Sequence, residues 1–365
     1  MLMRGTLKRT RAQLKDEFQR LNASVSIGGE GASVEVRREN LAATLKLVAE
    51  ALKEPAFPAT EFEEMKRAAL SGIEAQRTDP AALAGVQLTR HLQLYPPGHP
   101  NYTPSIDERI QWLREVTLDQ AKSCYRELYG ATGADFAAIG EVDAGELTAL
   151  VDELFGSWKT PQPFERVPSR YFDRPALEND VVTPDKANAV LRGGLNLKIR
   201  DDHPDFPALL LANQLLGGTS TARIPTRVRE KEGLSYSTYT SFSSGPFDEA
   251  ASFNISSIFA PQNRTRVESA IREELARALR DGFTAQEVEA GKKSILESRR
   301  ISRAQDGALL SRLSTYLFAK RTFAWDVELE SKIAALTPAQ VNDALRRNID
   351  PARISMVAAG DFKKP

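Results

Sequence analysis

The chain has 365 residues, of which 41% are hydrophobic, and its 49 lysines and arginines are balanced by 49 aspartates and glutamates. This length favours two or three domains with ordinary cores, and the charge balance argues against nucleic acid or an anionic membrane as a partner. The single cysteine, Cys124, excludes an internal disulfide and a cysteine-based zinc site, and no stretch is apolar enough for a membrane helix.

The first half of the chain alternates between helical and strand periodicity in a definite order. The expected helices cover residues 14–21, 41–52, 61–76, a further stretch to about 91, one beginning after Thr117, and 147–154. The expected strands are a hairpin over 25–36, folded at a Gly-Gly-Glu-Gly turn, and a strand from Asp135 to Ile139.

The second half repeats this plan after a Pro-rich and charged stretch without periodicity. The expected strands are 189–197, a hairpin of 234–242 and 251–258, and 353–359. The expected helices are 206–216, one ending at Gly233, 267–279, helical pattern over 286–318, and one beginning after Thr337.

The two halves also match residue by residue near their ends. Thr117 pairs with Thr337, and Gln120 pairs with Gln340, each at an offset of 220 residues. One repeat of this length indicates a duplicated domain, since solenoid repeats are much shorter. We therefore expect an α+β fold of two homologous domains, each an antiparallel-rich sheet with helices on one face, that superpose by a rough two-fold. The expected boundaries are 1–160, a linker over 161–180, and 181–365.

The first copy of the repeat has no counterpart for the opening of the second copy. Gly218-Thr219 corresponds to Gly5-Thr6, and the second copy has the strand 189–197 and the helix 206–216 ahead of that point. Only four residues precede Gly5. A sheet without its first strand has an unpaired edge and an uncovered apolar face. The comparison predicts that the chain is the tail of a longer polypeptide or that its start codon is misassigned.

Several segments resemble the insulinase/pitrilysin family of zinc peptidases, whose fold is also that of the mitochondrial processing peptidase. MLMRGTLKRT with the following hairpin, FPATEFEEMK, and YPPGHPNY resemble the first domain of that family. LLGGTSTARIPTRVREKEGLSYS resembles its C-terminal domain, and the GG…R…RExxGLxY pattern is the most specific part. The resemblance covers almost the whole chain and implies a peptidase fold of two related domains.

The resemblance also implies that this half holds no zinc. The family's His-x-x-Glu-His motif would fall immediately before Met1, and the third zinc ligand, a glutamate, falls close to Ser71 and Gly72, which cannot bind zinc. Glu74 is near, but it lies two or three residues further along the helix, so its side chain points in another direction than the ligand position. We expect a non-catalytic half without a cofactor, inactive alone, whose zinc-bearing partner half is fused or co-encoded.

The three histidines provide no alternative zinc site. His91, His99 and His203 have neither i,i+4 spacing nor a glutamate in helical register, so each is interpreted as a loop or surface residue.

The resemblance assigns substrate binding to two residues, Arg229 and Tyr236. In the family an arginine and a tyrosine of the C-terminal domain reach the bound peptide near the zinc of the catalytic half, and they match Arg229 and Tyr236 in R-x6-Y spacing. A guanidinium and a phenol are both suitable donors to a peptide carbonyl. The alternative is that Arg229 lies on a solvated face and Tyr236 packs on the sheet. Arg223 is a weaker candidate that only fixes the loop.

Three hypotheses remain open from the sequence. The first is a non-catalytic half that completes the peptide chamber of a zinc-bearing partner, and the second is a structural or assembly module of the same fold. The third is an active peptidase with unusual ligands. The chain shows no export signal, and a periplasmic location is favoured only if such a signal lies upstream.

Overall fold

The computed structural model describes residues 1–362, which form two compact units. Unit 1 comprises Met1–Gly72, Arg109–Arg166 and Leu309–Ser314. Unit 2 comprises Ile73–Glu108, Val167–Ala308 and the chain from Thr315 onward. No helix in the described residues combines the length and the hydropathy that crossing a membrane requires.

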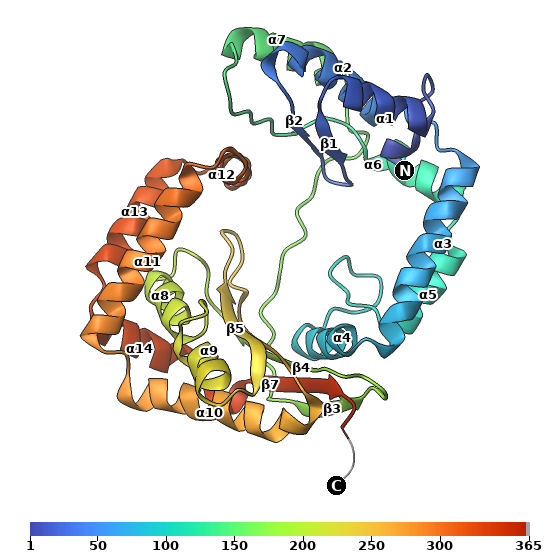
Figure 1. Ribbon diagram of the computed structural model, residues 1–365. Coiled ribbons are helices and arrows are strands. Elements are labelled where there is room, and N and C mark those ends of the chain that lie inside the picture. The colour runs from blue at the N-terminus through green and yellow to red at the C-terminus, as the bar shows by residue number, and fades with distance from the viewer. Residues whose placement is uncertain (363–365) are drawn as a thin grey trace. The chain divides into compact units, whose positions relative to one another are not determined.

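Unit 2 is organised around one five-stranded sheet in the order β3-β7-β4-β6-β5 (Figure 1). Its strands are β3 (Glu178–Val182), β4 (Ala189–Leu197), β5 (Ser235–Ser243), β6 (Ala251–Phe259) and β7 (Ser355–Gly360). Only the β3–β7 pair is parallel, and the other three pairs are antiparallel. The expected opening strand 189–197, the hairpin of 234–242 and 251–258, and the antiparallel-rich sheet are confirmed.

Helices from the second half of the chain cover one face of this sheet. They are α8 (Phe206–Leu216), α9 (Arg223–Pro225), the π-helical segment η4 (Thr226–Lys231), α10 (Arg264–Asp281) and α14 (Pro338–Asn348). The core lies between these helices and the sheet, where Leu191, Phe253 and Met356 of the strands cluster with Leu211 and Ile271 of the helices. Beyond this layer lie α11 (Ala285–Arg303) and α13 (Phe323–Ala335), which both contact α8. The helix α12 (Asp306–Ala319) supplies residues to both units.

The opposite face of the sheet is covered by α4 (Pro80–Leu92), a helix from the first half of the chain (Figure 1). Ala84 and Leu88 cluster with Val357 and Ala359 of β7, whereas Met356 and Ala358 face the other side. Gly194 of β4 provides the space, since a Cβ there would lie 2.6 Å from Leu92 Cδ1. The expectation of helices on one face is therefore wrong for this sheet, because β7 is apolar on both sides and β4 has a glycine where α4 crosses it.

Unit 1 contains a two-stranded hairpin and a layer of helices. The hairpin pairs β1 (Ser24–Ile27) with β2 (Ala32–Glu35), as expected. Its helices are α1 (Arg11–Arg20), α2 (Leu41–Lys53), most of α3 (Ala59–Ala75), most of α5 (Ile106–Glu115), α6 (Leu118–Leu128) and α7 (Ala144–Phe155). Leu14 and Phe18 of α1 pack with Leu47 and Val48 of α2 under the hairpin.

The strand expected from Asp135 to Ile139 does not form, and this expectation is wrong. The segment has no strand assignment, and Phe136 in it is 46% exposed. Its counterpart β7 is held between β4 and β3, whereas no described segment of unit 1 pairs with 135–139. An apolar segment without neighbouring strands has no ladder to join. The helix before it does repeat, since Thr117–Gln120 and Thr337–Gln340 form the same capping box.

The stretch expected to be a linker has no regular structure over residues 161–177. Its last residues begin β3, which adds an edge strand beside β7. The expected boundaries of two sequential domains remain a prediction.

Candidate functional site

The GG…R…RExxGLxY segment begins at the turn that ends α8. Thr240 of β5 donates its backbone N–H to the carbonyl of Gly217 at 2.9 Å. A Cβ at Gly217 would lie 2.5 Å from Thr240 Oγ1, so only glycine permits this approach. The turn is therefore held against the edge strand of the sheet.

The next part of the segment is a helix end with an unusual hydrogen-bond pattern. Residues Thr226–Lys231 form a π-type turn, a feature that is frequent at functional sites. Gly233 has a φ of +61°, and its N–H and that of Leu234 bond to the carbonyls of Arg229 and Val228. Val228 and Leu234 are buried at the two sides of this turn, which fixes the direction in which β5 starts.

Tyr236 lies at a β-bulge in β5. Ser235 is opposite Phe259 and Ser237 is opposite Ile258, so Tyr236 has no partner on β6. The hydroxyl of Ser235 stabilises the bulge, because it donates to the Ile258 carbonyl at 2.6 Å and accepts from the Ser237 N–H at 3.2 Å. A bulge redirects a side chain, and Tyr236 is 83% exposed.

The structure brings Arg229 and Tyr236 together. The guanidinium carbon of Arg229 lies 4.9 Å from the centre of the Tyr236 ring, a cation–π contact. The Arg229 side chain is 44% exposed and its Nε lies 3.3 Å from Glu230. Neither side chain belongs to the core. The alternative interpretation, in which Tyr236 packs on the sheet, is therefore wrong.

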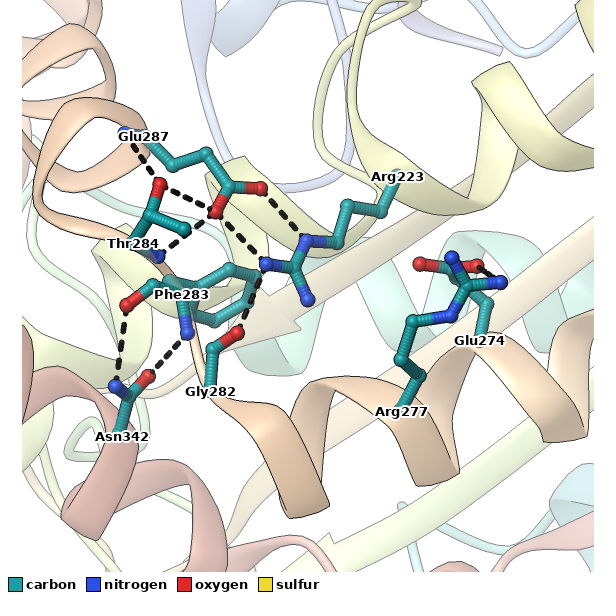
Figure 2. A network of polar contacts seen from close by, with 8 residues as sticks. All are labelled: Arg223, Glu274, Arg277, Gly282, Phe283, Thr284, Glu287 and Asn342. Atoms are coloured by element: carbon teal, nitrogen blue, oxygen red, sulfur yellow. Dashed lines mark hydrogen bonds and ion pairs between the residues drawn. The ribbon is translucent and has the colours of Figure 1, made fainter.

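Arg223 has a different environment, which Figure 2 shows. Its Nε and Nη2 donate to the two carboxylate oxygens of Glu287, each at 2.7 Å, and Nη2 also donates to the Gly282 carbonyl at 2.8 Å. The guanidinium also stacks on Phe283 at 4.7 Å. The hydrogen bonds from Arg223, together with those from Thr284, lower the pKa of Glu287 to about 2. Arg223 therefore fixes the loop, which is the role expected for it from the sequence.

Asn342 of α14 completes this network (Figure 2). Its Oδ1 accepts from the Phe283 N–H at 2.7 Å, and its Nδ2 donates to the Phe283 carbonyl at 3.2 Å. Neither Glu287 nor Asn342 was expected from the sequence to contact Arg223 or its loop. Thr284-Ala-Gln-Glu287 has the Thr-x-x-Glu pattern of a capping box, which predicts the start of helix α11. The pattern does not predict that Glu287 also pairs with Arg223.

The residues present do not fit a zinc ion. Ser71 and Gly72 lie exposed on α3, and neither side chain can ligate the metal. His99 stacks on Tyr95 and accepts from the Asn101 N–H. His203 accepts from the Asp205 N–H, and His91 bonds to the Pro175 carbonyl. Within residues 1–362, no three His, Cys, Asp or Glu side chains are grouped to hold a metal.

Comparisons with known proteins give a consistent family. Residues 115–295 match the model of the peptidase M16 inactive domain. A non-peptidase homologue of Helicobacter pylori is 21% identical over 94% of this chain and 78% of its own length. An uncharacterized zinc protease of Streptomyces coelicolor is 27% identical over 70% of this chain, and a probable inactive metalloprotease of Bacillus subtilis is 24% identical over 53%. This chain spans 56% and 45% of those two relatives.

Solved structures show the same fold. The peptidase M16 inactive domain from Pseudomonas fluorescens superposes with a TM-score of 0.85 at 24% identity, covering 100% of this chain and 87% of that one. A protease from Helicobacter pylori superposes with a TM-score of 0.83 at 14% identity, with the same coverage. These matches extend the α+β assignment over the whole chain.

Proposed function

Because this chain belongs to the M16 peptidase family and carries its inactive domain, as the insulinase/pitrilysin resemblance implied, we propose that it is the zinc-free half of a peptidase. It completes the substrate chamber and grips the peptide, while a zinc-bearing partner half supplies the metal. The names of the Bacillus and Helicobacter relatives, an inactive metalloprotease and a non-peptidase homologue, support the zinc-free part.

The observation that carries this proposal is the exposed pair of Arg229 and Tyr236. A tyrosine that is 83% exposed contributes little to the core, and the bulge that presents it is pinned by Ser235. The cation–π contact pre-orients the guanidinium before any peptide arrives, which lowers the entropic cost of binding. This arrangement is suited to a ligand rather than to stability.

The chemistry of the pair is donation without proton abstraction. The guanidinium has five N–H donors, and its ion pair with Glu230 runs through Nε, so further N–H donors remain for a peptide carbonyl and the Tyr236 hydroxyl can donate one more bond. If the partner half holds the zinc that would activate the attacking water, such donors would stabilise the charge that develops on the carbonyl oxygen of the scissile bond. In this proposal the chain positions the peptide and stabilises the developing negative charge, and the partner half hydrolyses the peptide bond.

The test reconstitutes this chain with a co-encoded family member that has an intact His-x-x-Glu-His motif. We expect Arg229→Ala and Tyr236→Phe each to lower kcat/KM for a quenched fluorescent peptide at least tenfold, because loss of an oxyanion donor costs about 10²–10³ in rate. The control is Arg300→Ala, whose side chain is 70% exposed and, among residues 1–362, pairs with its neighbour Glu297 on α11. It should retain wild-type turnover, and all three variants should melt like the wild type.

Two outcomes would overturn the proposal. Wild-type turnover in both site variants would remove Arg229 and Tyr236 from substrate binding. A complex whose hydrolysis is no faster than that of the partner alone would favour the alternative, a structural or assembly module of the same fold.

A further inference from the structure

One row of side chains crosses three strands on the face of the sheet that carries α4. Arg192 of β4 is opposite Ser256 of β6, and Ser256 is opposite Tyr239 of β5. Arg192 is two residues from Gly194, which contacts α4, and so points to the same face. The helix packs on β4 and β7, so this face of β6 and β5 lies beyond it. Tyr239 is 48% and Ile258 43% exposed there.

The row contains a cation without a counter-charge. Arg192 is half-buried, and Nη1 donates to Ser256 Oγ, but in the part of the chain that the structure describes it forms no ion pair. The half-buried Arg223, Arg264 and Arg321, by contrast, each pair with a carboxylate. The neighbouring positions on this face are neutral: Ser237, Ser241, Ser243, Ser252, Asn254 and Ile258. A partly desolvated guanidinium in neutral surroundings favours the approach of an anion.

Tyr239 adds a donor to the same place. Hydrogen bonds from Ser256 and then from Arg192 lower the pKa of the Tyr239 phenol. The Tyr239 hydroxyl has one O–H donor that a ligand can use. Arg192 has five N–H donors, more than its bonds to Ser256 and Tyr239 use. Two strands therefore present converging donors around one positive charge.

We infer that the row of Arg192, Ser256 and Tyr239 is a carboxylate-binding subsite for the bound peptide. The inference rests on the proposed peptide-binding function and extends it to substrate preference. Tyr239 follows Tyr236 by three residues on β5, which is about 10 Å at the rise of an extended strand. A peptide that lies along β5 with its carbonyl at Tyr236 therefore places a carboxylate about three residues away beside Tyr239, next to Ser256 of β6, to which Arg192 donates. The carboxylate comes from an Asp or Glu side chain or from the peptide's C-terminus.

The test measures binding of fluorescein-labelled nonapeptides of alternating Val and Ser to this chain by anisotropy. One peptide is neutral and C-terminally amidated, a second carries one Asp in the middle with an amidated end, and a third is neutral with a free C-terminal carboxylate. We expect one or both acidic forms to bind about tenfold or more tightly than the neutral one, the effect of charge-assisted hydrogen bonds. Which acidic form gains identifies the source of the carboxylate.

The variants separate this subsite from the rest of the site. Arg192→Met keeps the aliphatic stem and should abolish the preference for acid without weakening the neutral peptide, and Tyr239→Phe should reduce it several-fold. The control Arg300→Met should change nothing, and thermal melts verify folding. If the wild type binds all three peptides equally, or if Arg192→Met keeps the preference, the subsite is refuted and the proposed function stands. If the wild type binds none, both are refuted.

Discussion

Replacement of Arg223 by methionine should destabilise unit 2 by about 2 kcal/mol at neutral pH. Methionine keeps most of the apolar stem but removes both charge-assisted bonds to Glu287 and the bond to the Gly282 carbonyl. Each such bond is worth about 1.5–3 kcal/mol when buried, and partial exposure reduces this. The side chains of Arg223 and Glu287 are 17% and 32% exposed.

The pH dependence provides an independent limit on the same energy. Glu287 has a pKa of about 2 in the folded chain against 4.5 for a free glutamate. At about 1.36 kcal/mol per pH unit this difference gives a ceiling of about 3.4 kcal/mol, which solvent screening and the share due to Thr284 reduce to about 2. Because the folded pKa is depressed, the stabilisation is complete above pH 4.5 and is lost as the pH falls towards 2.

The assay is urea unfolding followed by Trp325 fluorescence between pH 7 and pH 3. Trp325 lies in unit 2, so Trp112→Phe and Trp158→Phe in the background remove the other two tryptophans, which belong to unit 1. The difference between Arg223 and Arg223→Met should be constant from pH 7 to about 5 and then shrink. Arg300→Met, at an exposed pair, should differ from the parent by less than about 0.5 kcal/mol. A difference that is absent at neutral pH, or that does not shrink on acidification, would refute the reasoning.

Two further predictions concern the same unit and the metal. Gly282→Ala should cost about 2–3 kcal/mol in urea unfolding, because Gly282 has a φ of +74° and its new Cβ would lie 2.4 Å from Asn342 Nδ2. Gly233→Ala, at φ +61° with open space around it, should cost only about 1–2 kcal/mol, and equal costs would show that Asn342 moves aside freely. The dialysed chain should contain far less than one zinc by elemental analysis and should not hydrolyse peptides. One zinc per chain with chelator-sensitive hydrolysis would contradict the zinc-free assignment.

Elements specified by local sequence were predictable almost to the residue. The strand 189–197 and the helix 206–216 were both expected from sequence, and both end where the structure places them. An apolar run identifies the strand, and Gly217 marks the end of the helix. The meeting of Arg229 and Tyr236 was also predictable, because Gly233 between them allows the reversal that a left-handed residue makes.

Features that depend on register were not predictable. The bulge at Tyr236 requires Ser235 to bond to Ile258 across the strands, and the row at Arg192 requires the alignment of three strands. Periodicity identifies which face of a strand is apolar, but it does not identify which residue of the neighbouring strand lies opposite a given residue. The strand expected at 135–139 shows the converse, since a sequence with a strand pattern still needs a neighbour to pair with.

The position of α4 has a consequence for how the chain folds. The helix is synthesised before both strands on which it packs, and Val357 and Ala359 of β7, which cluster with Ala84 and Leu88, follow it by about 270 residues. β4 is likewise open along one edge until β7 is made. Contacts between residues so far apart in the sequence form slowly. The apolar side of α4 and one edge of β4 therefore stay exposed until β7 has been synthesised. Unit 2 can therefore complete its sheet only after β7 has been synthesised, and we expect truncation before Gly360 to prevent its folding.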